Sequence, residues 1–212
     1  MTLTLAPTIL TIVRHGDTFF PGEPPRRIGA RTDLPLVASG EAQARALGAA
    51  FAGERIAFDR VLAAPLRRTQ ATAELMLGLL PAGSAIETAA WLAEIDHGPD
   101  EGQSEDAVLA RIGPEALARW NEDLAAPPGW TVDAPARLEA WRTLMVTGRG
   151  HLLLVTSNGA ARFALHADPA LARQASALAS RRLRTGAWGR IVVADGAARI
   201  AAWDRRPGEA QR

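Results

Sequence analysis

Short apolar runs alternate with segments of helical periodicity along this chain, and that alternation limits the possible folds more than any other feature. Strands are expected at residues 9–14, 59–63, 151–156, 190–194 and 198–203. Helices are expected at residues 40–53, with Ser39 as the N-cap, and at residues 66–80. This order predicts an α/β fold in which helices flank both faces of a mainly parallel central sheet.

Residues 98–150 differ from the rest of the chain. They are acidic and rich in tryptophan, and "APPGW" separates helical patches around residues 104–123 and 136–146. The segment is too long for an ordinary connection. We therefore expect one domain over residues 1–212, with a cap-like helical insertion at about 98–150 over the carboxyl end of the sheet. Ligands of open α/β sheets bind at that end.

The composition excludes several classes of protein. Cysteine is absent, which excludes disulfides and thiolate chemistry, and the four histidines show no metal-ligand spacing, so we expect no metal. The net charge is only +1 and no long basic run is present, so we expect no nucleic-acid partner. No apolar run approaches the roughly 20 residues of a membrane span, and the N-terminus lacks the basic flank of a signal peptide. A cytoplasmic location without a membrane partner is expected, and the oligomeric state is left open.

The first expected strand ends in "IVRHGDT", and this ending suggests chemistry. A neutral imidazole such as that of His15 is a competent nucleophile towards phosphorus, and Arg14 beside it would neutralise a phosphate and disfavour imidazolium. Gly16 would let the backbone approach a bound anion. Because all 24 basic residues are arginine, phosphate would be held by guanidinium groups. The alternative is a histidine that only makes structural hydrogen bonds.

Two further segments carry candidate partners for His15. In "APLRRTQATAE", Arg67 and Arg68 open a helix. The helix dipole favours an anion at this end, so two cations are unfavourable here unless an anion is bound beside them. The alternative is a surface pair that faces water. In "WLAEIDHGPDEG", Glu94 follows apolar residues that would raise the pKa of its carboxyl and make it a proton donor. The alternative is a solvated acidic loop.

Taken together, "RHGDT", "GARTDLPLVASGEAQARALG", "APLRRTQATAE", "LAEIDHGPDEG" and "LLLVTSNGAARF" resemble the histidine phosphatase superfamily, the phosphoglycerate mutase-like proteins. The resemblance covers roughly half of the chain. It implies that His15 is the phosphorylated nucleophile, that Arg14 and Arg68 clamp the phosphate and that Glu94 is the general acid. It also implies a metal-independent reaction without a cofactor.

The chain departs from the family pattern at a turn that usually contains a second histidine. Here the turn reads Ser157, Asn158 and Gly159, and the resemblance makes Asn158 and Gly159 substrate-binding residues. An asparagine amide can donate a hydrogen bond to a phosphoryl oxygen, but it brings no positive charge. Smaller departures are Ala64, where serine is common, and Pro21, where many members have asparagine.

The sequence therefore predicts a phosphoric monoester hydrolase that acts on a small phosphorylated molecule, with activity reduced by Asn158. One alternative is a phosphoglycerate mutase-type phosphotransferase. Mutases of the family hold their substrate with a tyrosine and a lysine; this chain contains neither, and His97 stands where the tyrosine would fall. Another alternative is a catalytically weak protein that binds a phosphorylated ligand without turnover. Specificity is expected from the insertion and from residues 19–31.

Overall fold

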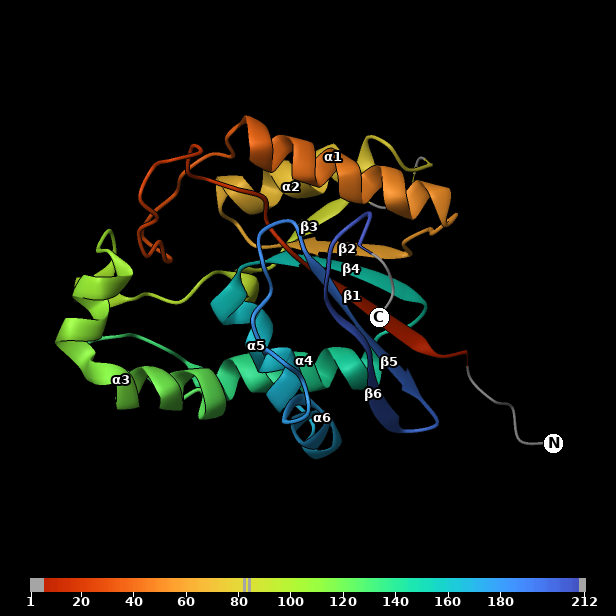
Figure 1. The fold of residues 1–212 in the computed structure, drawn as a ribbon. Helices are drawn as coiled ribbons and strands as arrows, with labels where there is room; N and C mark the ends of the chain where they lie inside the picture. Colours follow the sequence, from red (N-terminus) through yellow and green to blue (C-terminus); the bar gives the residue numbers. More distant parts are fainter. Residues whose placement is uncertain (1–5, 82, 84, 210–212) are drawn as a thin grey trace.

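A computed structural model describes residues 6–81, 83 and 85–209, and a six-stranded sheet forms its centre (Figure 1). The strand order is β3-β2-β4-β1-β5-β6. β1 to β4 run parallel, and β5 and β6 form an antiparallel hairpin at one edge. The strands span Thr8–Arg14, Arg60–Ala63, Ile86–Thr88, His151–Thr156, Trp188–Ala194 and Ala197–Arg205. The mainly parallel sheet is confirmed, and only β3 was not predicted.

Helices cover both faces of the sheet, as the sequence predicted. On one face lie α1 (Ala38–Gly53) and α2 (Arg67–Leu77), which enclose a core around Phe51, Met76 and Val155 (Figure 1). On the other face lie α4 (Ala134–Thr147), α5 (Asn158–His166) and α6 (Pro169–Ala175). They bury a larger core that includes Trp141 and Phe163. Burial of these apolar side chains fixes the sheet between two helical layers.

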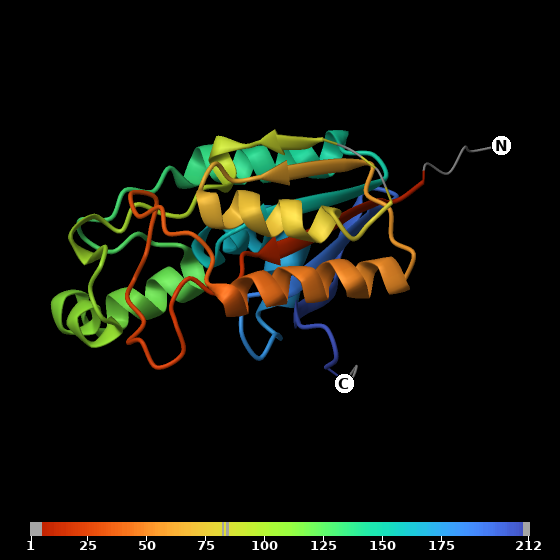
Figure 2. The same cartoon turned by 90° about the horizontal axis from the view of Figure 1, so that it is seen from above.

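The predicted insertion contains two helices that lie in different places. In both views α3 (Glu105–Asp123) lies beyond the ends of β1 and β4, on the same side as the loop that follows β1 (Figures 1 and 2). Its course is interrupted at Gly113, whose φ of 76° is non-helical, just before Pro114. By contrast, α4 packs on the face of the sheet through Trp141, Leu144 and Met145. The carboxyl end of the sheet is therefore covered by α3 and its flanking loops, and the division into one domain with a cap stays a prediction.

The N-terminus of α1 differs from the prediction. The helix begins at Ala38 with Val37 as its N-cap, and the hydroxyl of Ser39 donates to Asp17 at 3.2 Å. Ser39 is thus inside the first turn, where it ties α1 to the loop after β1. The Ser39 cap prediction was wrong because the side chain found a partner outside its own helix.

The register of β1 and β4 decides where the candidate residues meet. Arg14 is paired with Thr156, and the backbone N–H of His15 donates to the Thr156 carbonyl at 3.0 Å. The end of β1 therefore lies beside Ser157 and Asn158, where α5 begins. Two short 3-10 helices, Ala90–Leu92 and Gly98–Asp100, frame the segment after β3. Within the part of the chain that the structure describes, none of the helices has the length and apolar character needed to span a membrane.

Candidate active site

The imidazole of His15 is buried directly after β1, with 2% of the residue exposed. Its Nδ1 lies 2.8 Å from the Gly16 carbonyl oxygen, which can only accept, so the proton is on Nδ1. The other nitrogen, Nε2, is then unprotonated, and its lone pair accepts the Nε–H of Arg68 at 3.2 Å. Burial first, and then the charges of Arg68 and Arg14, hold the pKa of His15 well below its usual value. The ring is therefore neutral at neutral pH.

Arg68 is fully buried, whereas its neighbour Arg67 is exposed. The Arg68 guanidinium is held by three contacts: the bond to His15 and bonds to the carbonyl oxygens of Thr32 at 2.6 Å and Gly29 at 3.2 Å. A surface role for Arg68 is ruled out by this burial. Its cation is fixed beside the lone pair of His15 by the loop after β1.

Gly16 serves backbone packing, which is not what we expected. A Cβ added at Gly16 would lie 2.3 Å from the carbonyl oxygen of Gly40 in α1. Glycine is therefore required for the close packing of this backbone on the first turn of α1, and an approach of the Gly16 backbone to an anion stays a prediction. Asp17 extends this junction, because its carboxylate accepts from Gln43 at 2.8 Å and from Thr185 at 2.5 Å.

The carboxylate of Glu94 lies in the same buried region, 7% exposed, after the 3-10 helix Ala90–Leu92. One oxygen accepts the N–H of Ile95 at 2.9 Å and the other accepts the N–H of Gly159 at 3.1 Å. A Cβ on Gly159 would lie 2.2 Å from Oε1 of Glu94. Only glycine therefore fits the start of α5 at this distance from the carboxylate, and the Gly159 amide is occupied by Glu94. We call His15, Arg68, Glu94 and Gly159 the His15 cluster.

The pKa of Glu94 is lowered, and our expectation of a raised value was wrong. Burial alone would raise it, as the apolar neighbours suggested, but His97, the two amide hydrogen bonds and Arg68 together outweigh burial. His97 itself has a lowered pKa because it is buried, so at neutral pH the amides and Arg68 provide this stabilisation. In the free protein Glu94 is a carboxylate.

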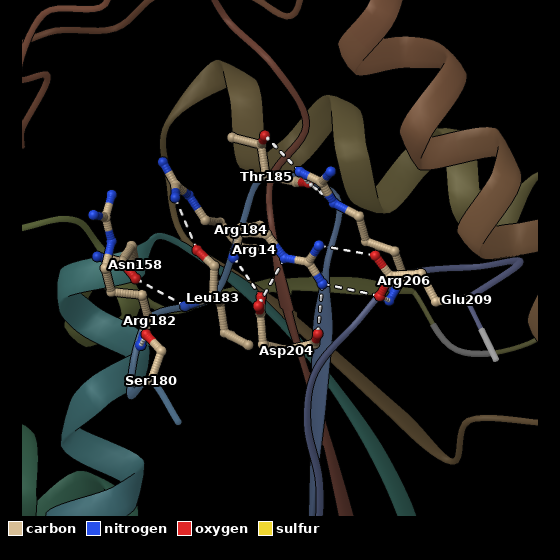
Figure 3. Close-up of polar contacts among 10 residues, drawn as sticks. All are labelled: Arg14, Asn158, Ser180, Arg182, Leu183, Arg184, Thr185, Asp204, Arg206 and Glu209. Atoms are coloured by element: carbon tan, nitrogen blue, oxygen red, sulfur yellow. Dashed lines mark hydrogen bonds and ion pairs between the residues drawn. The ribbon is translucent and has the colours of Figure 1, made fainter. Parts of the chain in front are cut away.

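Arg14 and Asn158 meet at Leu183, in the loop that precedes β5 (Figure 3). Nη1 of Arg14 donates to the Leu183 carbonyl at 2.8 Å, and the Leu183 N–H donates to Oδ1 of Asn158 at 2.9 Å. Because its oxygen is engaged, the NH₂ group of Asn158 is directed elsewhere, and it has no protein partner among the described residues. Both side chains line the cavity described next.

A cavity of about 1000 Å³ opens above these residues at the carboxyl ends of β1 and β4. Its lining comes from residues 17–28 after β1, from α3, from the start of α5, and from residues 180–185 before β5. Glu94 and His97 also face it. The loop after β1 and the insertion were expected to border the site. The contribution of residues 180–185 was not predicted.

Arginine dominates the charge of this cavity. Besides Arg14, the lining contains Arg26, Arg27, Arg162, Arg182, Arg184 and Arg206. Three of these have carboxylate partners: Arg26 pairs with Glu23, Arg27 with Glu105, and Arg184 with Asp204 and Glu209. Arg206 donates to the Thr185 carbonyl. The structure gives Arg14, Arg162 and Arg182 no ion pair among the described residues, so the cavity presents free positive charge.

The sequence analysis missed Arg162 and Arg182, although one signal was present. Arg162 is four residues after Asn158 on α5, and this spacing places both side chains on one face of the helix. Nothing in the sequence around Arg182 indicated that residues 180–185 return to the cavity. The whole arrangement, a neutral buried imidazole beside several arginines and one carboxylate, suits an anionic ligand with oxygen atoms, such as a phosphate.

Comparisons with known proteins agree with this geometry. The model of the histidine phosphatase superfamily, branch 1, matches residues 10–206. A 2,3-bisphosphoglycerate-dependent phosphoglycerate mutase from Azorhizobium caulinodans is 30% identical over 160 residues, which cover 71% of this chain and 76% of the mutase.

Solved structures are similar in fold. An alpha-ribazole phosphatase from Shigella flexneri has a TM-score of 0.68 at 22% identity, over 96% of this chain and 100% of that chain. A mycobacterial glucosyl-3-phosphoglycerate phosphatase has a TM-score of 0.73 at 20% identity, over 93% and 99% of the two chains. The sequence resemblance is thus confirmed at the level of the family: this chain belongs to the histidine phosphatase superfamily.

Proposed function

We propose that the protein is a phosphatase that transfers the phosphoryl group of a small phosphorylated molecule to His15 and then to water. One observation carries the proposal: the proton of His15 is on Nδ1, at the Gly16 carbonyl, so Nε2 is unprotonated, with its lone pair beside Arg68. A buried histidine that is kept neutral by burial and two cations is prepared to attack phosphorus. A purely structural histidine has no need of either cation.

The reaction has two steps. First, Nε2 of His15 attacks the phosphorus, the N–P bond forms, and the bond between phosphorus and the ester oxygen breaks while that oxygen takes a proton from Glu94. Second, water attacks the phosphorus and gives a proton to Glu94, the N–P bond breaks, and His15 regains its lone pair as phosphate leaves. In both steps the site holds the attacking and leaving atoms in line.

Arginine supplies the charge that the transferred phosphoryl group requires. In the structure the Nε–H of Arg68 donates to Nε2 of His15, and we infer that a phosphoryl oxygen accepts from Arg68 in its place when the substrate enters, which frees the lone pair of Nε2. Arg14, with its Nε buried and unpartnered, provides a further donor. Because guanidinium groups stabilise the developing charge, the proposal includes no metal ion and no cofactor.

Glu94 must be protonated before it can act as the general acid. The lowered pKa makes it a carboxylate in the free protein. A phosphoryl dianion that enters beside it adds negative charge, which raises the pKa of the carboxyl. We infer that substrate binding itself loads Glu94 with the proton that the leaving oxygen receives. The two amides that hold the carboxylate, including that of Gly159, keep it aimed at the phosphoryl site.

We further propose that Asn158 occupies the place of the second histidine of the family. Its NH₂ group has no protein partner among the described residues and would donate to a phosphoryl oxygen. A neutral donor contributes less than a charged one, about 1 kcal/mol against roughly 1.5–3 kcal/mol, which predicts a slower enzyme. If the loss of charge at Asn158 abolished turnover altogether, the protein would only bind a phosphorylated ligand.

A mutase reaction is the second candidate, because the Azorhizobium caulinodans relative is a phosphoglycerate mutase. In that reaction the phosphoryl group on His15 would return to an organic hydroxyl rather than to water. The two candidates differ in their products. Release of inorganic phosphate supports the phosphatase, whereas a phosphorylated product isomeric with the substrate supports the mutase.

The experiment is turnover of a generic aryl phosphate by the parent, by a His15→Ala variant, and by a His166→Gln variant as a control for loss of a histidine outside the cavity. We expect phosphate release by the parent and the control, and at least a thousandfold loss in His15→Ala, typical of a removed nucleophile. An alkaline quench should trap one acid-labile phosphoryl group on the parent. Phosphate bound but not released by the parent would favour the binding protein, and undiminished turnover by His15→Ala would overturn the mechanism.

A further inference from the structure

Arg162 is a charged side chain that the proposed reaction does not use. It lies on α5 one helical turn after Asn158 and lines the cavity, yet only 3% of the residue is exposed. Nη1 donates to Oδ1 of Asn121, a neutral partner, at 2.7 Å, and Nε is buried with no partner. Among the described residues no carboxylate forms an ion pair with Arg162, and Glu94 acts on it only through its field. A buried guanidinium with a free donor and no ion pair is costly to keep, unless it binds an anion for part of the time.

Arg182 is the second such residue, and it comes from a different element. It lies in the loop before β5, lines the same cavity and is exposed. Its guanidinium makes no hydrogen bond or ion pair with any described residue, and only its backbone N–H is engaged, by Ser180. Figure 3 shows the guanidinium groups of Arg14 and Arg182 on the same side of the Asn158–Leu183 hydrogen bond, while Arg184 turns away to Asp204 and Glu209.

These two arginines are distinct from the pair that acts on His15. The cations whose fields act on His15 are Arg68 and Arg14. Arg162 interacts instead with Glu94, Arg182, Arg27 and Arg14, and burial together with the cations lowers its pKa to about 10, so it stays charged at neutral pH. The charge of Arg14 thus acts on both His15 and Arg162. We call Arg162 and Arg182 the arginine wall.

We propose that the arginine wall binds a second anionic oxygen group, a carboxylate or a phosphate, of the same molecule whose phosphoryl group faces His15. The inference rests on the proposed function, because it defines the substrate class as a phosphomonoester with a second anionic end. A substrate with one phosphoryl group would satisfy Arg14 and Arg68 and leave Arg162 and Arg182 without an ion-pair partner. A molecule with two anionic ends satisfies both groups, and a cavity of about 1000 Å³ accommodates it.

Phosphonates test this idea without any need for turnover, because their carbon–phosphorus bond is not hydrolysed. The probes are alkylphosphonates that carry, two to five methylenes from the phosphorus, a methyl group, a carboxylate, a methyl ester of that carboxylate, or a second phosphonate. Calorimetric affinities are measured for the parent, Arg162→Gln, Arg182→Gln, the double variant, and Arg199→Gln. Arg199 is exposed on β6 and does not line the cavity, so its variant controls for the loss of one positive charge.

We expect at least one spacer length at which the parent binds a probe with two anionic ends at least tenfold more tightly than its methyl counterpart. The methyl ester should bind like the methyl probe. The preference should fall below threefold in the double variant and persist in Arg199→Gln. Preference for the carboxylate series or for the bisphosphonate series identifies which anion the substrate carries.

Other outcomes overturn the inference. If no spacer length gives a preference in the parent, or if the preference survives in the double variant, the arginine wall is not a second anion site. The failure of the proposed function would look different. A parent that prefers the two-anion probes but releases no phosphate from the corresponding phosphate esters retains the second site and loses the phosphatase reaction.

Discussion

The His15 cluster reaches the cavity through Glu94 and Gly159, the arginine wall lines the same cavity, and the two are built in different ways. In the cluster, the guanidinium of Arg68 is fully buried and held by His15, Thr32 and Gly29. In the wall, Arg182 is exposed and its guanidinium has no partner among the described residues. Fixed geometry suits a reaction that needs atoms in line, whereas free donors suit the recognition of a variable part of a ligand. The difference suggests that the His15 cluster carries out the reaction and that the arginine wall selects the substrate.

The largest effect is expected from a substitution that disturbs the His15 cluster and leaves every charged residue in place. Gly159→Ala places a methyl group 2.2 Å from Oε1 of Glu94, so the carboxylate must move. We expect about a hundredfold loss of kcat/KM, the lower range for removal of a general acid. Gly53→Ala is the control, since a Cβ there meets nothing within 4 Å. The double variant with Glu94→Gln and Gly159→Ala should have a kcat/KM only slightly lower than that of Gly159→Ala. Additive losses in kcat/KM would show that Gly159 acts separately from Glu94.

The same substitution on both surfaces tests the difference in a matched way. Arg68→Lys keeps the charge but cannot reproduce the three fixed contacts of the guanidinium, so kcat/KM should fall at least tenfold. Arg182→Lys retains a mobile cation in an exposed place and should lower kcat/KM about two- to threefold. Equal losses in steady-state kinetics would remove the distinction between the two surfaces.

Asn158 lies at the boundary between the two surfaces, and its substitution should have an intermediate effect. Asn158→Ala removes a donor and also frees the Leu183 N–H, with a cost of about 1 kcal/mol, or roughly fivefold in kcat/KM. Asn158→His should sustain or raise activity, most visibly below about pH 6.5, where an unperturbed imidazole becomes charged. If neither variant changes turnover or phosphate affinity, Asn158 is a structural turn residue.

The last expected effect is on stability. His15 has a pKa well below 6.5 in the folded protein, chiefly because it is buried, so the unfolded chain takes up a proton near pH 6.5 that the folded protein does not. His15 therefore makes the free energy of unfolding fall as pH decreases below about 6.5, by at most about 1.4 kcal/mol per pH unit for one proton. Denaturant unfolding at pH 7 and pH 5 should show a smaller loss in His15→Asn than in the parent. Arg182→Gln should lose as much as the parent.

The sequence predicted the His15 cluster far better than the wall, for a physical reason. Arg14, His15 and Arg68 belong to short motifs that adjoin a strand end or a helix start, so local pattern and charge reveal them. The pKa of Glu94 was mispredicted because His97, the Ile95 N–H, the Gly159 N–H and Arg68 outweigh burial, and the last two are distant in sequence, Gly159 by 65 residues. Its apolar neighbours alone gave the opposite sign.

The sequence analysis missed features whose local sequence pattern is weak or whose position depends on contacts with distant parts of the chain. β3 contains only three residues, Ile86–Thr88, with one apolar side chain, and exists because it pairs with β2. The close packing of Gly16 on Gly40 of α1 is a tertiary contact that the local sequence did not indicate. Residues 180–185 reach the cavity because β5 runs antiparallel to β1 and its first residue, Trp188, pairs with Val13 near the end of β1. No local sequence pattern indicates this position.

The ion pairs of Arg184 have a consequence for protein engineering. Its guanidinium bonds to Asp204 and Glu209, which lie on β6 and just after it, and so attaches the loop before β5 to the outer edge of the sheet. In that loop the guanidinium of Arg182 has no partner among the described residues, whereas that of Arg184 is the anchor. A library that varies the residues around Arg182 while it retains Arg184, Asp204 and Glu209 would change substrate preference with little risk to the nucleophile, since β1 and β4 are left untouched.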